Sequence, residues 1–193
     1  VPPTVNSTVS YCQNSVASQL TATGTSLKWY NSASGGISSP NAPTPSTSNT
    51  GSVNYYVSQT VNSCESNRTS INVTVNSIPA SPGVNSPVNY CQNSIVIQLT
   101  ATGTSLKWYN SSSGGTSSTN APVPSTTNTG TVNYYVSQTV NNCESNRALI
   151  SVVVNSTPSA PSVVTPVKYI QNTVAVPLTA TGSSLKWYNS SSG

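Results

Sequence analysis

The sequence predicts an all-β protein built from tandem antiparallel β-sandwich modules in an extended array. Three observations lead to this fold class. Short segments alternate apolar and polar residues, and Gly, Pro, Asn and Ser separate these segments. No stretch has the 3.6-residue periodicity of an amphipathic helix. The same order of segments also returns along the 193 residues, which indicates one module used more than once.

The sequence repeats itself at a fixed interval. Residues 11–89 align without gaps on residues 90–168, with 58 of the 79 positions identical, and residues 169–193 begin a third copy. We therefore divide the chain into repeat 1 (1–78), repeat 2 (79–157) and the N-terminal part of a truncated repeat 3 (158–193). Half a module cannot bury its hydrophobic face, so we expect a fragment of a longer array. Proline-stiffened linkers, 76–82 and 155–161, favour an extended string.

Within repeat 1 the segments follow in a clear order. Residues 19–23 and 26–30 alternate and are joined by a tight turn at Gly24. A region rich in Ser, Thr, Pro and Asn (39–50) follows, in which we expect one or two weak strands. Residues 53–58 and 71–75 give two more strands with a period of two. About seven short strands per module are typical of an antiparallel β-sandwich.

The composition excludes most chemistry. The chain has no Asp, His, Met or Phe, and its only carboxylates, Glu65 and Glu144, are equivalent positions of two repeats. General acid–base catalysis and zinc or calcium sites need side chains that are missing here, so we expect no enzyme, no metal and no cofactor. Six basic residues are spread evenly, which argues against nucleic-acid binding. No apolar run approaches the roughly 18 residues that a membrane-spanning helix needs, so we expect no membrane insertion.

Five motifs carry a resemblance to a known family. They read YCQNS, LTATG, LKWYNSASGG, NYYVSQT and CESNR in repeat 1. In this order they resemble bacterial immunoglobulin-like repeats of large secreted and cell-surface proteins from gliding Bacteroidota-type bacteria, which the type IX secretion system exports. Trp29 takes the place of the strand C tryptophan, Tyr55 that of the tyrosine corner, and Val57 that of the second core cysteine. The resemblance implies immunoglobulin-like modules that are secreted or displayed on the cell surface.

The four cysteines stand outside the usual core positions, before strand B and after strand F. In a secreted chain, two pairs of cysteines at equal spacing favour structural disulfides, and we expect Cys12 with Cys64 and Cys91 with Cys143. Strands B and F run parallel in immunoglobulin order, however, which places these cysteines at opposite ends of the sandwich. The alternative is a bridge between modules, from Cys12 to Cys143. Buried unpaired cysteines are a third reading.

The third YCQNS copy reads YIQNT, with Ile170 in place of the cysteine. If the disulfides lie within modules, the partner position at the same spacing beyond Gly193 should also lack its cysteine. If they run between modules, the following module should lack its second cysteine instead. In both cases the cysteine is a removable structural element, because a lone exposed thiol is a liability outside the cell.

Strand alternation also predicts a surface. If Leu27 and Trp29 point inward, Lys28 and Tyr30 point outward beside Tyr56. Such a face could contact a sugar or a protein, or it could be a cross-strand aromatic pair that steadies the sheet. The candidate face is Lys28, Tyr30 and Tyr56, with Lys107, Tyr109 and Tyr135 in repeat 2. We also expect Glu65 and Arg68 to form a solvated ion pair.

Together these features predict a non-enzymatic stalk or shaft of a secreted adhesin or filament. Its partners would be neighbouring repeats of the same long chain, a surface polysaccharide or protein ligand, or laterally associated copies. One alternative is a carbohydrate- or protein-binding module. Another is a spacer of a secreted enzyme whose catalytic domain lies outside this chain.

Overall fold

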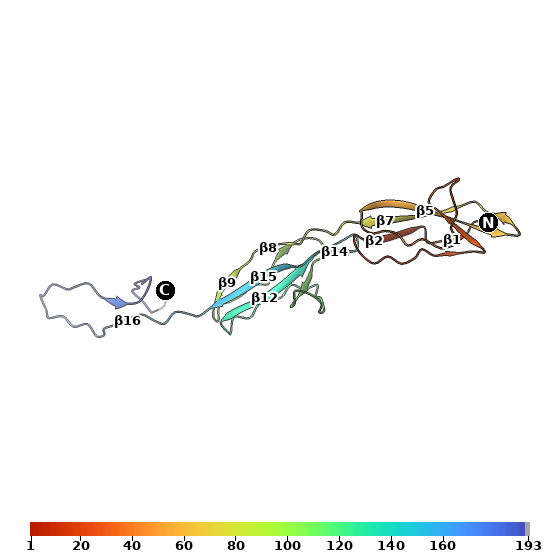
Figure 1. Ribbon diagram of the computed structural model, residues 1–193. Coiled ribbons are helices and arrows are strands. Elements are labelled where there is room, and N and C mark those ends of the chain that lie inside the picture. The colour runs from red at the N-terminus through yellow and green to blue at the C-terminus, as the bar shows by residue number, and fades with distance from the viewer. Residues whose placement is uncertain (192–193) are drawn as a thin grey trace.

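The computed structural model describes residues 1–191, and these residues form strands and no helix. Figure 1 shows the two complete repeats in a row, followed by the shorter C-terminal segment, so that the molecule is elongated. This arrangement confirms the predicted all-β fold of tandem modules. The described residues contain no helix that is long and apolar enough to cross a membrane.

Repeat 1 is built on one five-stranded sheet, in which four strands lie in a row and a short fifth strand pairs with the end of one of them. The four strands lie in the order β2 (Thr8–Cys12), β7 (Thr69–Asn76), β5 (Gly51–Val61) and β4 (Leu27–Tyr30). The β5–β7 and β4–β5 pairs are antiparallel, whereas β2 and β7 are parallel. This parallel pair was not expected, and it arises because the N-terminal segment changes partners. Its first part, β1 (Thr4–Val5), pairs with β3 (Ala22–Thr23) instead. A short β6 (Cys64–Glu65) folds back on the end of β5.

Repeat 2 has the same topology, as its sequence identity requires. The main sheet has the order β11-β12-β15-β9, and two strand pairs, β8–β10 and β13–β14, correspond to β1–β3 and to the β5–β6 hairpin. The strands are β8 (Gly83–Val84), β9 (Val88–Cys91), β10 (Ala101–Thr102), β11 (Lys107–Tyr109), β12 (Gly130–Ser137), β13 (Thr139–Val140), β14 (Cys143–Glu144) and β15 (Ala148–Asn155). In residues 158–191 only β16 (Ser162–Val163) and β17 (Ala180–Thr181) pair.

Each complete repeat has its own core on one face of the main sheet. Alternate residues of β7 point into it, and Ile71 and Val73 are 1% and 2% exposed. Val57 of β5 and Trp29 of β4 meet them there, and Leu20 covers them from the opposite layer. In repeat 2 the same positions form an equivalent cluster. The modules are therefore thin sandwiches with one layer more regular than the other.

The second layer is less regular than the alternation predicts. Of the strand expected at 19–23, only Ala22–Thr23 pairs, although Leu20 is buried and its backbone N–H donates to the Pro43 carbonyl at 2.9 Å. The weak strands expected in 39–50 reduce to one bridge between Trp29 and Ser39. Prolines explain this outcome, because a residue without an N–H cannot continue a ladder of backbone hydrogen bonds.

Candidate functional site

The two complete repeats are held together by a disulfide as well as by their linker. Cys12, the last residue of β2, is bonded to Cys143, the first residue of β14, and their Cα atoms lie 5.5 Å apart. Cys12 lies beside Asn76 at the end of the main sheet, and the Asn76 side-chain amide donates to the Asn141 carbonyl at 3.4 Å. We call these four residues (Cys12, Asn76, Asn141 and Cys143) the junction. It fixes the end of one sheet against the β13–β14 hairpin of the next repeat.

The hairpin turn presents the second cysteine. Asn141 and Asn142 connect β13 to β14 with φ angles of 49° and 62°. Asn tolerates this left-handed conformation better than other residues with a side chain, and two such residues in succession suit a tight hairpin. The turn directs Cys143 toward repeat 1, and its side chain is fully buried.

The predicted pairing within modules is wrong. Cys12 lies level with the start of β5 near Gly51, because both are placed beside the end of β7. Cys64 pairs with Val61 at the other end of β5. The length of strand from Gly51 to Val61 is roughly 34 Å. A disulfide needs Cα atoms within about 7 Å, so Cys12 cannot reach Cys64 inside one folded repeat. The structure has the alternative bridge between modules, and Cys64 and Cys91 are free and exposed.

A second site gathers polar side chains around one carboxylate in each repeat. In repeat 2, Glu144 accepts a hydrogen bond from Tyr109 at 2.5 Å and one from Ser137 at 2.6 Å, both at Oε1. Lys107 Nζ lies 2.9 Å from Oε2 and forms a salt bridge. We call these four residues the glutamate cluster. Glu65 has the same partners in repeat 1, namely Tyr30, Ser58 and Lys28.

These partners change the acidity of the carboxylates. Hydrogen bonds from Ser58, Tyr30 and Lys28 lower the pKa of Glu65 to about 2. For Glu144, burial acts to raise the pKa, but hydrogen bonds from Ser137, Tyr109 and Lys107 outweigh it and lower the pKa to about 2. The hydrogen bond to the carboxylate in turn raises the pKa of Lys28 above 10.5. An ionised, fully bonded carboxylate braces a fold well and is a poor proton donor or acceptor at neutral pH.

The arginines do not pair with the glutamates, so the predicted ion pair between Glu65 and Arg68 is wrong. Arg68 stacks over the Tyr30 ring at 3.3 Å from its centroid and donates to the Ser32 carbonyl at 2.6 Å. Arg147 stacks in the same way over Tyr109. The stacked guanidinium covers one face of the tyrosine ring while the phenol oxygen bonds the carboxylate.

This arrangement also corrects the predicted binding face. Tyr30 and Tyr109 are only 7% exposed, so they cannot form part of an open aromatic patch. Alternation correctly placed Tyr30 and Trp29 on opposite faces of the sheet. At this point, however, Arg68 and Glu65 cover the outer face, on which Tyr30 lies. The remaining members of the predicted face are half-buried, namely Lys28, Tyr56, Lys107 and Tyr135. Across neighbouring strands, Tyr30 lies directly opposite Tyr56, and Tyr109 lies directly opposite Tyr135.

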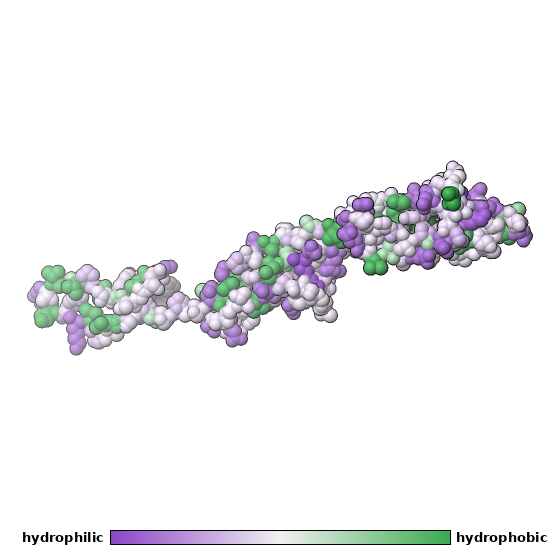
Figure 2. Space-filling view, in the orientation of Figure 1, coloured by the Kyte–Doolittle hydropathy of each residue, from purple (hydrophilic) through white to green (hydrophobic). Residues whose placement is uncertain are grey.

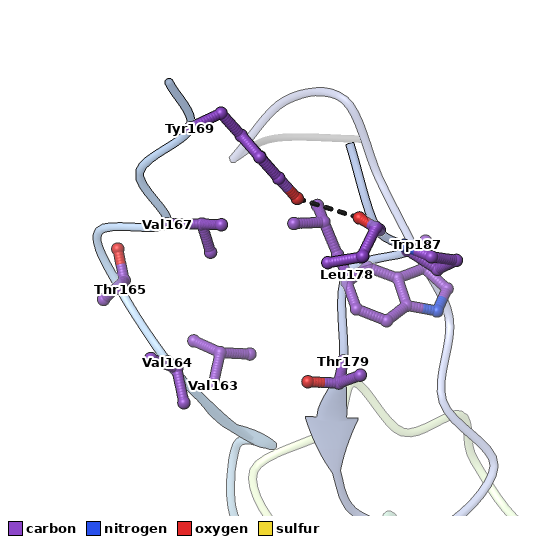
Figure 3. A pocket seen from close by; sticks show the side chains of 10 residues that line it. Val163, Val164, Thr165, Val167, Tyr169, Leu178, Thr179 and Trp187 are labelled. Carbon is purple, nitrogen blue, oxygen red and sulfur yellow. Dashed lines mark hydrogen bonds between the residues drawn. The ribbon is translucent and has the colours of Figure 1, made fainter. Parts of the chain in front are cut away.

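Residues 158–191 carry an apolar pocket of about 550 Å³ (Figure 3). Val163, Val167, Leu178 and Trp187 line it, and Tyr169 closes one side by donating a hydrogen bond to the Val176 carbonyl at 2.8 Å. The equivalents of these lining residues one period earlier belong to the core of repeat 2, where β12 and β15 cover them. The pocket is thus a module's inner face without those two strands, and Figure 2 shows apolar residues exposed there.

Part of the glutamate cluster could have been predicted from the sequence. Lys28 and Tyr30 share one face of a strand, and the motif CESNR, which contains the glutamate, occurs in both complete repeats. The buried serine, Ser58 or Ser137, gave no such signal, since a strand serine usually faces solvent. Recognising its role needs the pairing of β5 with β6, which brings Ser58 and Glu65 together.

Comparisons with known proteins identify the family of the modules. Among solved structures, the chain is similar to human protocadherin-24 EC1-2 (11% identity, 81% of this chain and 99% of that chain, TM-score 0.30). It is also similar to mouse cadherin-23 EC22-24 (10% identity, 80% of this chain and 65% of that chain, TM-score 0.25). No curated protein sequence matches. Residues 1–76 and 79–155 both match the family described as "Ig-like domain CHU_C associated". With two matches over most of its length, the chain belongs to this family of Ig-like domains.

Proposed function

We propose that the chain is a non-enzymatic spacer, a segment of the stalk of a secreted or cell-surface adhesin or filament. The junction is the observation that carries this proposal. A disulfide between consecutive modules restricts the angle and the distance between them, in addition to the linker. A bond inside one sandwich would stabilise that module about as well, but it would not hold one module against the next. A bond across the boundary serves the shape of the array.

The chemistry of the chain supports an extracellular location. Disulfides persist in oxidising surroundings, and Cys12–Cys143 would be reduced in most cytosols. The motif resemblance extends the proposal to export by type IX secretion in gliding bacteria. A spacer beside a secreted catalytic domain would use the same mechanical property. A sugar- or protein-binding face receives no support from Tyr30 and Tyr109, because both are buried under arginines.

The proposal is tested by measuring the stiffness of the repeat pair in solution. Small-angle X-ray scattering of the oxidised protein should give the pair-distance distribution of an elongated, rigid particle. In the Cys12→Ser variant the distribution should broaden, because only the linker then sets the angle between repeats. Cys64→Ser is the matched control and should scatter like the wild type, since Cys64 is free. If the oxidised protein is already as flexible as Cys12→Ser, the spacer role is wrong.

A further inference from the structure

The junction connects two strands that run in the same direction along the molecule. β2 ends at Cys12, where repeat 1 meets the β14 end of repeat 2 (Figure 1). β15 begins at Ala148, opposite Val136 of β12, and leads away from that hairpin to Asn155 beside the end of β9. β2, the disulfide and β15 therefore form a covalent path that passes along both repeats.

The path bypasses most of the chain. Residues 13–142 lie between the two bonded cysteines in sequence and outside the path. The buried core of repeat 1, from Leu20 to Val73, lies entirely within this bypassed segment. Tension that enters before β2 and leaves after β15 has a covalent route along these strands. It does not have to pass from one strand to the next across either sheet.

Without the bond, the same tension has to cross both main sheets. In repeat 1 it enters at Thr8 and leaves at Asn76, so the parallel strands β2 and β7 are pulled lengthwise in opposite directions. In repeat 2 it enters at Val88 and leaves at Asn155, across the parallel pair of β9 and β15. Only hydrogen bonds and side-chain packing resist this sliding. Each repeat unfolds at the rate at which those contacts fail under load.

We propose that the Cys12–Cys143 disulfide makes the repeat pair a tension-bearing tether, in which the load follows β2 and β15 and leaves both repeats folded. This inference rests on the spacer proposal and adds that the spacer works under tension. A rigid pair that unfolds under load would refute the tether and leave the spacer role intact.

The path bends at one place. Between Cys143 and Ala148 the chain turns from β14 into β15, and the pairing of Cys143 with Val140 folds this stretch back on β13. Tension straightens these five residues to at most about 17 Å unless noncovalent contacts hold the bend. The hairpin is thus the point at which the load reaches noncovalent contacts.

The glutamate cluster lies directly behind the loaded cysteine. Glu144 follows Cys143, and its three partners in the cluster lie on β11 and β12, two strands outside the path. The next residue, Ser145, is buried, and its backbone N–H donates to the Gln138 carbonyl at 2.9 Å. These contacts anchor the bend to the sheet. We therefore assign Glu144 the role of a positioning residue that keeps the cross-linked hairpin seated under tension.

Repeat 1 contains the same cluster behind a cysteine that is not bonded. Glu65 follows the free Cys64 and has the equivalent lysine, tyrosine and serine as partners. Tension that follows β2 to Cys12 does not pass through this hairpin. The two repeats thus offer chemically equal clusters, of which one lies on the path and the other does not.

The first test pulls single molecules of the chain through its two termini. Cys64→Ser and Cys91→Ser remove the free thiols and leave the Cys12–Cys143 bond. After reduction, each repeat should unfold in a step of about 215 Å, because about 68 residues extend to roughly 230 Å from a folded distance of roughly 15 Å. The oxidised protein should show neither step at the forces that produce both in the reduced protein. Residues 158–191 lie outside the bridged loop and extend in both states.

The second test compares the two clusters in the oxidised protein of the same background. Glu144→Gln should yield at a lower force than the parent, with an extension of at most about 17 Å as the bend straightens. Glu65→Gln is the matched control and should give the parent trace. Both variants lose the same kind of charged hydrogen bonds, so a purely structural role would change the two traces alike. Lys107→Met and Lys28→Met form a second matched pair that keeps the carboxylates, for use if loss of Glu144 prevents folding.

The outcomes separate the tether from the spacer. Steps of about 215 Å in the oxidised protein, at the forces found after reduction, would overturn the tether. Equal traces for the on-path and off-path variants would also overturn it, because the load would then not reach the Cys143 hairpin. A pair that is flexible by X-ray scattering, yet shows no such step when oxidised, would refute the spacer role alone.

Discussion

Reduction of the Cys12–Cys143 disulfide should lengthen the fully stretched chain by about 450 Å, since each released residue adds roughly 3.4 Å. The bond joins residues that are 131 apart in sequence, so these residues cannot extend when the ends are pulled. Subtracting 131 from 193 residues leaves 62 that can extend. The oxidised chain therefore reaches roughly 210 Å and the reduced chain roughly 660 Å.

Single-molecule pulling through the two termini measures this difference directly. Substituting Ser for the free Cys64 and Cys91 prevents other cross-links and leaves the bond under study. Contour lengths are then compared before and after reduction with dithiothreitol. An oxidised chain that stretches as far as the reduced one would refute the bridge between modules. Bonds within modules cannot form in this background, so a shorter oxidised chain reports the Cys12–Cys143 bond alone.

Four further outcomes are expected. Cys12→Ser should lower the free energy of unfolding repeat 2 by about 4 kcal/mol, because the bond closes a long loop from Asn76, beside Cys12, to Cys143. Glu144→Gln should cost about 1–2 kcal/mol at neutral pH, since its charged hydrogen bonds lie at a partly exposed site. The folded pKa of Glu144 is about 2 and its ordinary value 4.5, so wild-type stability should fall as pH drops through that interval, less so in the variant. Ile150→Ala should cost about 2–5 kcal/mol because Ile150 is 1% exposed. Iodide should quench Trp187, which is 57% exposed, far more than the other two tryptophans.

Each expectation has a measurement and a control. Denaturant unfolding of Cys64→Ser should match wild type, and a loss as large as that of Cys12→Ser would show that thiol removal itself destabilises the fold. Urea titrations between pH 4.5 and 2 test Glu144→Gln, and parallel curves for variant and wild type would count against the carboxylate. Ile95→Ala, at a 96% exposed position, should change stability by less than about 0.5 kcal/mol. Trp187→Phe should remove most of the quenchable fluorescence; retention would place a second tryptophan in solvent.

The sequence predicted the sandwich and the repeat because both depend on local pattern. Alternation in 71–75 and at Trp29 identifies the core without knowledge of partners, and self-alignment identifies the module. The disulfide could not be derived in this way. Its pairing depends on which end of the sheet each cysteine occupies, and that follows from β2 running parallel to β7. The separation from Cys12 to Cys64 equals that from Cys91 to Cys143, but this equality is compatible with bonds within modules and with bonds between them. It therefore does not decide the pairing.

Tyr30 shows a second limit of local pattern. Alternation correctly placed it on the face opposite Trp29, and from this its exposure was expected. Glu65 and Arg68, which cover that face, belong to a segment that lies far from Tyr30 along the chain. Sequence periodicity assigns a side chain to a face of the sheet, but it does not say whether a distant loop covers that face.

The confinement of charge within each repeat affects how the protein meets other molecules. Lys28 and Glu65 neutralise each other, and Arg68 lies flat on a tyrosine ring, so repeat 1 has one net positive charge and no other charged side chain. Beyond a Debye length of about 8 Å at physiological salt, such a surface exerts almost no field. Approaching molecules are neither steered nor repelled over distance. Contacts between repeat 1 and neighbouring molecules would then depend on short-range hydroxyl and amide groups, and they should be nearly indifferent to the salt concentration of the surroundings.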